Sequence, residues 1–378
     1  GRDLGREENV MFVHTTLIPI MGSVGEEKTK PTQHSVKELM SIGIRPDIIV
    51  GRCSEPISAA ARAKIAMFCD VPEEAVISTP DARSIYEVPL NLERQGVADY
   101  IIDKMKLGPM TTRRDMDSWE RFVSRIVNPR REVTIALVGK YTALADSYLS
   151  HLEAFTHAGA SRECKVRIRF IDSDDLLKED PEKLLGGIHG VIVPGGFGIR
   201  GVEGKIVAAR YARENMIPFL GVCLGFQIAT IEFCRHVLGL GMASSTEFDP
   251  QTPDPVICIM GEQIGVTDMG ATMRLGAQDV AITEGSRAHA LYGTARISER
   301  HRHRYEVNPD YIQRMEDAGW RFTGRSECGT RMEIGELEGH PFFVASQFHP
   351  EFKSRPGSPS PLHQGLVDAA IAYKEGHD

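Results

Sequence analysis

Cys223 stands between two glycines, in the run Gly221-Val-Cys223-Leu-Gly225, and is well placed for nucleophilic chemistry. An apolar run precedes the motif and a helical pattern follows it, so it has the G-x-[S/C]-x-G form of a nucleophile elbow. The glycines allow a sharp turn, and the start of a helix favours the thiolate, which is the reactive form of cysteine. The alternative is a structural cysteine that packs between two glycines.

A base for this thiol is offered by His349-Pro-Glu351, which follows the apolar run 342–348. A thiolate nucleophile needs a base and a group that orients the base. Glu351 could accept a hydrogen bond from one imidazole nitrogen and leave the other nitrogen for Cys223. Alone, the pattern is more typical of a surface histidine and a solvated glutamate. Together with the elbow it favours a Cys-His-Glu triad.

Glycines in the run Pro194-Gly-Gly-Phe-Gly198 form a third element of the predicted site. Glycines after a strand allow main-chain N–H groups to point into a cavity. The N–H of Gly196, together with that of Leu224, would make an oxyanion hole for a tetrahedral intermediate. The alternative is an ordinary glycine turn, and the turn supports catalysis only if it adjoins the other two motifs.

Strands and helices alternate around these motifs. Apolar runs of strand length end at or near each motif, and helical patterns follow them. Such alternation predicts an α/β fold with a mostly parallel central sheet, covered on both faces, and with its sites at the carboxyl ends of the strands. The predicted strands are 133–139, 190–196, 217–222 and 341–348, and the predicted helices are 147–159 and 226–238.

The first hundred residues have a similar pattern of their own, with strands predicted at 10–19 and 47–50 and a helix at 58–69. Proline and paired arginines then mark the stretch after residue 106, which suggests a linker with one helical piece at 118–126. The predicted domains are therefore 1–106, a linker 107–132, and 133–378. The chain starts with Gly1 and reaches an apolar run almost at once, so we expect a cut within a domain.

Composition excludes several function classes. The 378 residues carry 44 Lys+Arg and 52 Asp+Glu, a net charge of −8, whereas a whole-chain nucleic-acid binder should be basic. No apolar stretch approaches the roughly 18 residues of a membrane span. The seven cysteines are scattered without a C-x-x-C pair, which is typical of a reduced, cytosolic protein. We expect a cytoplasmic protein without nucleic-acid or membrane partners.

His301-Arg-His303 is the remaining chemical pattern in this part of the chain. Two histidines at i and i+2 could bind a metal ion, but no cysteine or acidic residue with ligand spacing accompanies them. We therefore expect a charged loop over the substrate pocket, and no metal site in this chain.

The three motifs together resemble the class I glutamine amidotransferases from about Val133 onwards. The resemblance implies Cys223 as nucleophile, His349 as general base and acid, and Glu351 as the orienting carboxylate. Glutamine would acylate the thiol and release ammonia, and water would then free glutamate. The residues implied in the oxyanion hole and in glutamine binding are Gly196, Leu224, Gly225, Phe226, Gln227, Glu247 and Arg304.

A more specific resemblance, to the CTP synthase family, runs through nearly the whole chain. K-T-K-P-T-Q-H-S-V-K-E-L (28–39) is dense in cations and hydroxyls ahead of a helix, which suits a polyphosphate, although a solvated lysine-rich loop is the alternative. The family resemblance is also carried by G-G-F-G-x-R-G-V-E-G-K (195–205), R-H-R-H-R-Y-E-V-N (300–308) and S-Q-F-H-P-E-F (346–352).

This resemblance implies the amination of UTP to CTP, with ATP activating the uracil and ammonia arriving from the glutaminase site. It further implies Mg²⁺, GTP as activator, CTP as feedback inhibitor and a homotetramer. Ala82 matches the adenine edge of the ATP site. The residues that match contacts to UTP or CTP are Lys28, Thr29, Lys30, Pro31, Thr32, Gln33 and Lys64.

The chain departs from the family pattern in two respects. The segment between Pro255 and Gly270, near the place where GTP acts in the family, is shorter than in the longer bacterial members. The second departure concerns ATP. No G-x-x-x-x-G-K-[ST] motif occurs in the chain, and the family's P-loop and Mg²⁺ carboxylates would lie before Gly1. We therefore expect a chain that lacks the P-loop and retains only the glutaminase half. Two alternatives stay open: an α/β-hydrolase with a cysteine nucleophile, whose acid normally precedes its histidine, and a non-catalytic assembly fragment.

Overall fold

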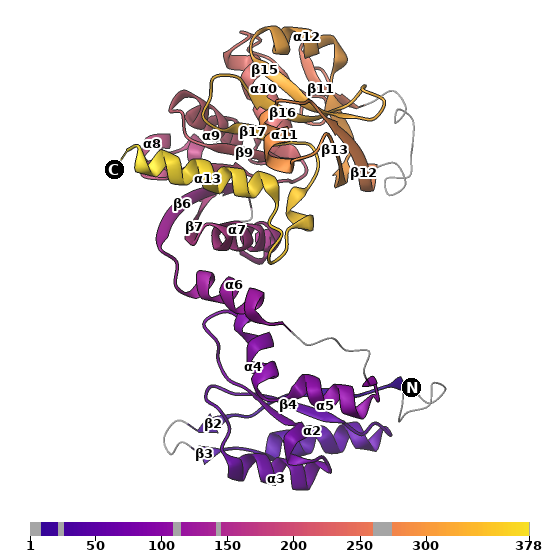
Figure 1. Cartoon of the computed structure of the whole chain (residues 1–378). Helices are drawn as coiled ribbons and strands as arrows, with labels where there is room; N and C mark the ends of the chain where they lie inside the picture. Colours follow the sequence, from indigo (N-terminus) through magenta and orange to yellow (C-terminus); the bar gives the residue numbers. More distant parts are fainter. Residues whose placement is uncertain (1–8, 22–25, 109–114, 141–144, 260–273, 378) are drawn as a thin grey trace. The chain divides into compact units, whose positions relative to one another are not determined.

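The computed structural model describes residues 9–21, 26–108, 115–140, 145–259 and 274–377. These fall into two compact units, Gly1–Val127 and Asn128–Asp378, and each is described by itself (Figure 1). The predicted chain start and residues 109–114 of the predicted linker lie outside the described residues.

Unit 1 is a small α/β unit. Its described residues form a parallel sheet in the order β1 (Val13–Leu17), β4 (Ile48–Arg52), β5 (Val76–Thr79), and a hairpin of β2 (Ile20–Met21) and β3 (Glu26–Glu27). The helices of this unit are α2 (Lys30–Ser41), α3 (Ala59–Cys69), α4 (Val88–Arg94), α5 (Val97–Lys104) and α6 (Asp117–Val127), and of these α2, α3 and α4 contact the sheet.

Two predictions for unit 1 compare directly with these elements. The predicted helix 58–69 is α3, and it begins after Ser58, whose hydroxyl accepts a hydrogen bond from the Ala61 amide. The predicted linker is partly structured, because α6 packs through its apolar face. Trp119 donates its indole N–H to the Tyr86 carbonyl at 2.8 Å, and Phe122 meets the Tyr86 ring edge-on with centroids 5.1 Å apart.

Unit 2 is built on a larger sheet. Its described residues form nine strands in the order β13-β12-β15-β16-β17-β9-β8-β6-β7. The strands β7 (Cys164–Asp172), β6 (Arg131–Gly139), β8 (Gly190–Val193), β9 (Phe219–Val222) and β17 (Phe343–Ser346) are parallel. The antiparallel strands are β16 (Met332–Leu337), β15 (Trp320–Ser326), β12 (Arg274–Ile282) and β13 (Arg296–His303).

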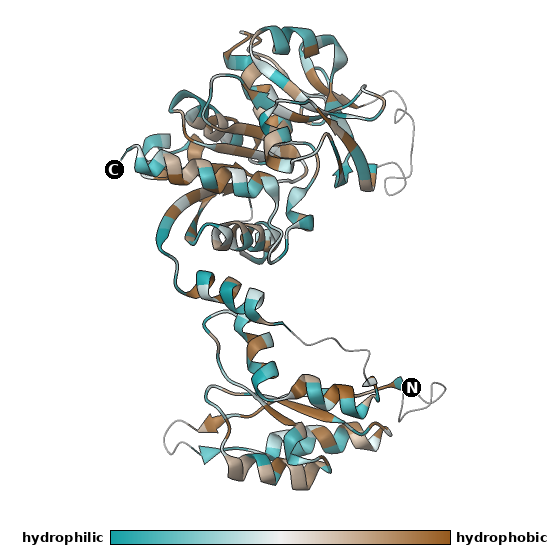
Figure 2. Ribbon diagram, viewed as in Figure 1, coloured by the Kyte–Doolittle hydropathy of each residue, from teal (hydrophilic) through white to brown (hydrophobic). Residues whose placement is uncertain are grey.

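Two apolar cores cover the faces of the parallel strands, because successive side chains of a strand point to opposite faces. Ile135 and Leu137 of β6 pack with α7 (Leu149–Ser161) and α13 (Pro361–Glu375). Ala136 and Val138 pack with α9 (Val202–Glu214) and α10 (Leu224–His236). Figure 2 shows these strands as largely hydrophobic ribbons between the helices. The α/β class and the mostly parallel central sheet are confirmed.

The remaining elements of unit 2 are a smaller sheet and several short helices. A smaller sheet has the order β10 (Ser244–Ser245), β11 (Pro255–Ile259), β14 (Tyr305–Val307). The other helices are α8 (Pro181–Leu185), α11 (Arg287–Tyr292) and α12 (Pro309–Asp317), with a short 3₁₀ helix, η8 (Pro350–Lys353), after β17. Among the described helices of both units, none combines the length and apolar character that crossing a bilayer requires.

Candidate active site

Three neighbouring parallel strands end at the predicted chemical motifs. β8 pairs with β9, and β9 pairs with β17, all in the same direction. The glycine turn at Gly195 follows β8, Cys223 follows β9, and His349 follows β17. Because the carboxyl ends of parallel strands meet at one edge, sheet pairing alone brings the three motifs together.

The turn at Cys223 has the strained geometry of a nucleophile elbow. Its φ is 53° and its ψ is −100°, which is an unusual backbone conformation for a residue with a Cβ. Its amide donates to the Ser346 carbonyl at 2.7 Å, which ties the elbow to β17. The residue directly precedes α10, so the elbow stands at the partially positive N-terminus of that helix.

The two glycines of the elbow are required by close packing. A Cβ on Gly225 would lie 2.0 Å from the Val193 carbonyl oxygen, and a Cβ on Gly221 would lie 2.5 Å from the Gly225 oxygen. Neither neighbour is a flexible side-chain end. Both backbones would have to move before any side chain could fit.

We therefore expect Gly225→Ala to destabilise unit 2 by about 2 kcal/mol through overpacking and to displace the elbow. Urea unfolding followed by intrinsic fluorescence measures the loss. Gly241→Ala is the matched control, because a Cβ there meets no heavy atom within 4 Å and the backbone has no positive φ. An equal effect of both changes would contradict the packing argument.

The predicted base and its orienting acid are in direct contact. His349 Nδ1 lies 2.8 Å from Glu351 Oε1, and the Glu351 side chain is buried. A carboxylate can only accept, so Nδ1 donates and Nε2 is left for the thiol. Burial by itself would raise the pKa of Glu351, but the neighbouring imidazoles of His151 and His349 and the hydrogen bond from His349 lower it well below its usual range. Glu351 is therefore an anion at neutral pH.

Cys223 and His349 meet at Gly195. A Cβ on Gly195 would lie 2.8 Å from His349 Cε1 and 3.5 Å from Cys223 Cβ, so both side chains lie next to Gly195. Burial tends to lower the pKa of His349, yet its hydrogen bond with Cys223 and the contact with Glu351 outweigh burial and raise it well above its ordinary value. This geometry favours a thiolate–imidazolium pair.

A cavity of about 330 Å³ opens beside the thiol, which is of the size that binds small molecules. It is lined by Gly196, Phe197, Cys223, Leu224, Gln227, Glu247, His303, Arg304 and Tyr305. Five of the seven predicted oxyanion and glutamine-binding residues are in this lining. Gly225 and Phe226 are not in it.

Packing explains why Gly225 and Phe226 do not line the cavity. Gly225 faces Val193 of β8, where no Cβ fits. Phe226 is fully buried in the core on the α9–α10 side, where its ring meets Phe322. Burial of such a ring contributes about 1.5–3 kcal/mol, so this side chain serves the fold rather than the pocket.

The polar side chains of the pocket are already oriented. Glu247 Oε1 accepts from the Gly198 amide at 3.0 Å, which fixes the glycine turn. Gln227 donates to the Tyr305 carbonyl at 3.2 Å and to Gln347 at 3.4 Å. Gln347 in turn lies 3.9 Å from Cys223 Sγ. Gln347 and Tyr305 were not predicted as site residues, although they stand inside S-Q-F-H-P-E-F (346–352) and R-H-R-H-R-Y-E-V-N (300–308).

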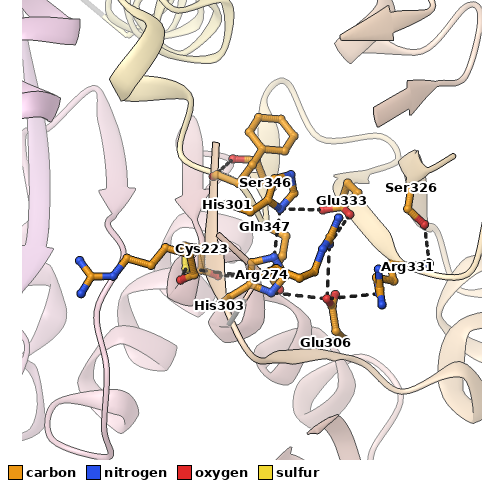
Figure 3. A network of polar contacts seen from close by, with 12 residues as sticks. Cys223, Arg274, His301, His303, Glu306, Ser326, Arg331, Glu333, Ser346 and Gln347 are labelled. Carbon is orange, nitrogen blue, oxygen red and sulfur yellow. Dashed lines mark hydrogen bonds and ion pairs between the residues drawn. The ribbon is translucent and has the colours of Figure 1, made fainter. Parts of the chain in front are cut away.

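His301 and His303 do not lie in a charged loop, so that prediction is wrong. Both belong to β13 and are buried, and His301 Nδ1 lies 3.0 Å from His303 Nε2. Figure 3 shows the buried network around them, in which Arg274 bridges Glu333 and Glu306 with Nη1–oxygen distances of 2.6 and 3.4 Å. Alternation along β13 directs these imidazoles inward.

The same network bears on metal binding. His301, His303 and Glu333 hold potential ligand atoms within 4.8 Å of one another. The Arg274 guanidinium, however, already pairs with the carboxylate, and burial together with Arg274 lowers the pKa of His301 to about 3. Because Arg274 already neutralises the Glu333 carboxylate, the cluster fits an ion-paired support for the strand that leads to Arg304.

In unit 1 the predicted nucleotide residues fall into two groups. Lys28 pairs with Glu26 at 2.7 Å, and the hydrogen bond and charge of Lys28, followed by the charge of Lys64, lower the pKa of that carboxylate. Lys30 and Lys64 are exposed, at the start of α2 and within α3. The structure therefore gathers cations around the β2–β3 hairpin.

The second group serves the fold of unit 1. Thr29 and Thr32 are buried; Thr29 Oγ1 accepts from Gln33 at 3.2 Å, and Thr32 Oγ1 donates to the Leu17 carbonyl at 3.4 Å. The other two predicted residues, Pro31 and Ala82, are exposed. Pro31 stands in the first turn of α2. Ala82 is exposed in the loop after β5, at the carboxyl end of the parallel sheet.

Two family models match the chain. The model "Glutamine amidotransferase class-I" matches residues 143–369, and "CTP synthase N-terminus" matches residues 2–107. Together they cover both units. The prediction that this chain lacks the P-loop and retains only the glutaminase half is not borne out, because the N-terminal model matches as well.

Known relatives are similar along almost the entire chain. The CTP synthase of Archaeoglobus fulgidus is 53% identical over 98% of this chain and 68% of its own length. That of Thermococcus gammatolerans is 54% identical over 98% of this chain and 69% of its own length. This similarity excludes the cysteine α/β-hydrolase alternative.

A solved structure is similar to the part that carries the pocket. The glutaminase domain of Trypanosoma brucei CTPS, determined with bound acivicin, is 41% identical, with a TM-score of 0.59 over 64% of this chain and 94% of that domain. The class I amidotransferase fold is thus confirmed for unit 2. The chain belongs to the CTP synthase family, the glutamine-hydrolysing ligases of pyrimidine biosynthesis.

Proposed function

We propose that Cys223, His349 and Glu351 hydrolyse glutamine and that the ammonia released aminates UTP to CTP. One observation carries the first half: the strained elbow, the base and its carboxylate converge at the ends of β9 and β17, beside a cavity of about 330 Å³. The proposal extends the family assignment to named residues.

In the first step the Cys223 thiolate attacks the side-chain amide carbon of glutamine and forms a C–S bond. The carbonyl oxygen becomes an oxyanion, stabilised by the N–H groups of Gly196 and Leu224. The imidazolium of His349 donates its proton to the amide nitrogen. The C–N bond breaks, ammonia leaves, and a thioester remains on the sulfur.

In the second step the neutral His349 takes a proton from water, which attacks the thioester carbon. The C–S bond breaks, glutamate is released, and the imidazolium beside the thiolate is restored. Glu351 remains ionised throughout, because its role is to hold the ring in one tautomer and to stabilise its positive charge. No oxidant or reductant is required.

Glutamine recognition rests on complementary charge in the pocket. The Glu247 carboxylate suits the α-ammonium group, and the Arg304 guanidinium suits the α-carboxylate. Gln227 completes the polar lining. Because Glu247 also accepts from the Gly198 amide, substrate binding and the shape of the glycine turn depend on one side chain.

The acceptor half follows from family membership. ATP would phosphorylate the uracil 4-oxygen, and ammonia would displace the phosphate. We further propose GTP as activator of hydrolysis, CTP as feedback inhibitor and a homotetramer as the assembled form. Within the described residues the candidate metal cluster is His301, His303 and Glu333, which does not fit Mg²⁺, a cation that prefers oxygen ligands. No step proposed here passes through that ion.

Lys30→Ala should weaken UTP binding by about tenfold, because a charge-assisted contact to phosphate is lost. Calorimetric titration with UTP measures the change. Glutamine hydrolysis should stay unchanged, since Lys30 lies in unit 1 and the pocket in unit 2. Lys37→Ala, which removes another exposed lysine of α2, is the control and should bind UTP normally. A matched loss of thioester formation would argue against this assignment.

Glutamate release from glutamine, measured with and without GTP, tests the proposed function as a whole. Release that rises with GTP supports both the triad and activation. A folded protein that binds glutamine but releases no glutamate would favour the remaining alternative, a non-catalytic assembly role.

A further inference from the structure

Polar side chains continue behind the proposed triad, where an apolar core would be expected. His151 of α7 and His363 of α13 are both buried, 5% and 0% exposed, beside η8, which carries Glu351. Ser360, also buried, directly precedes α13. The C-terminal elements η8 and α13 and the remote helix α7 thus contribute polar groups to one place.

These groups form a continuous chain that ends on the carboxylate. Ser360 Oγ lies 2.8 Å from His363 Nδ1, and His363 Nε2 lies 3.0 Å from His151 Nδ1. His151 Nε2 lies 3.6 Å from Glu351 Oε1, the oxygen that also accepts from His349.

The carboxylate fixes the direction of every donor in this chain. An ionised carboxylate attracts an N–H group and repels a nitrogen lone pair, so His151, whose Nε2 faces Glu351 at 3.6 Å, carries its proton on Nε2. A neutral His151 then accepts at Nδ1 from His363 Nε2–H, and His363 accepts at Nδ1 from the Ser360 hydroxyl. Burial lowers the pKa of both rings, that of His363 to about 3, which keeps them neutral. All dipoles therefore point towards Glu351.

Other charged groups face the same region. Glu299 of β13 lies near Glu351. Burial and the charge of Glu351 raise the pKa of Glu299 to about 7, although Lys353 and the hydrogen bond from the Tyr292 hydroxyl act to lower it. His349, which directly precedes η8, lies close to His151, and His157 of α7 lies close to His363. Among the described residues, Glu299 therefore opposes the ionisation of Glu351, whereas the donors that end at His151 favour it.

We propose that His151 and His363, with Ser360, are positioning residues for glutamine hydrolysis. They form a relay, a hydrogen-bonded row of neutral groups that orients Glu351 through the His151 N–H facing its carboxylate at 3.6 Å. The proposal rests on the proposed function of the triad. Apolar side chains would fill this space at lower desolvation cost, so two buried imidazoles in line with the carboxylate are explained by the orientation they impose.

The test compares His151→Phe, His363→Phe and the double variant. Each should lower kcat for glutamine hydrolysis about tenfold, the effect of one lost polar contact to a charged group, with KM little changed. Because the rings act in series, the double variant should be no worse than His151→Phe alone. His363→Gln, whose amide N–H can replace Nε2–H, should retain most of the activity.

A second readout does not depend on turnover. The rate of Cys223 alkylation by iodoacetamide reports the thiolate as a function of pH. A less well oriented Glu351 stabilises the imidazolium less, so the acid limb of alkylation should move to higher pH in His151→Phe and stay in place in His363→Gln. If the unchanged protein hydrolyses no glutamine, the proposed function fails, while this alkylation shift still decides the relay.

His340→Phe is the control for simple destabilisation. His340 is also buried, but it bonds the backbone of Ala212 and Phe342 rather than the triad. It should lower the unfolding midpoint and leave the pH profile unmoved. Unshifted profiles in His151→Phe and His363→Phe, or additive losses in the double variant, would overturn the relay and leave the two histidines as core residues.

Discussion

Cys223→Ser should abolish glutamine hydrolysis, with a loss of about four orders of magnitude or more, as expected when a catalytic nucleophile is removed. A serine hydroxyl is not ionised near neutral pH, and a proposed thiolate–imidazolium pair cannot form with it. Since serine is close in size to cysteine, the elbow at φ 53° should keep its shape. Glutamate release and trapping of the thioester measure the effect.

The same variant separates the two proposed activities. CTP formation supplied with ammonium salt should continue at the rate of the unchanged protein, because the acceptor chemistry does not use the thiol. Cys328→Ser, which alters an exposed cysteine, is the matched control and should keep full glutaminase activity. Loss of both activities in a folded Cys223→Ser protein would contradict the separation into two sites.

Glu351→Gln should reduce kcat for glutamine hydrolysis by about 10³- to 10⁴-fold, as when the carboxylate of a catalytic triad is replaced by its amide. The amide can present an N–H to the ring, which selects the wrong tautomer of His349. It also removes the negative charge that holds the pKa of His349 above its ordinary value.

The pH profile gives the sign of this effect. With the charge removed, the pKa of His349 falls, so the imidazolium is lost at lower pH and the basic limb of the pH–rate profile moves to lower pH. The thiolate loses its cationic partner, so the acid limb of the profile moves to higher pH. The pH range in which the enzyme is active therefore becomes narrower at both ends. Glu338→Gln, an exposed glutamate paired with Arg321, is the control. An unshifted profile with normal turnover would remove Glu351 from the triad.

Local sequence signals were sufficient for the chemical groups and for the strands that carry them. The elbow, the P-G-G turn and H-P-E each follow an apolar run, and parallel strands must present their carboxyl ends at one edge. For this reason the convergence of Cys223, His349 and Glu351 could be predicted from motifs far apart in the chain. The helix over 58–69 was predictable in the same way, from its periodicity and its capping serine.

Side-chain environment was less predictable, because it depends on neighbours that local patterns do not specify. Phe226 directly follows the elbow motif but points into the core. Thr29 and Thr32 stand in the cationic motif but bond within unit 1. In each case the elements that pack against the segment determine which of its side chains are buried in the core and which remain at the site.

What the sequence by itself determined is the set of reactive groups and the α/β order that aligns them, since both depend on short segments. Only the tertiary structure decided the surroundings of those groups. His301 and His303 became a buried ion-paired support through Arg274 and Glu333, and His151 and His363 met behind Glu351. Such contacts join strands and helices that are remote in the chain, and they form only when the two cores close on opposite faces of the sheet.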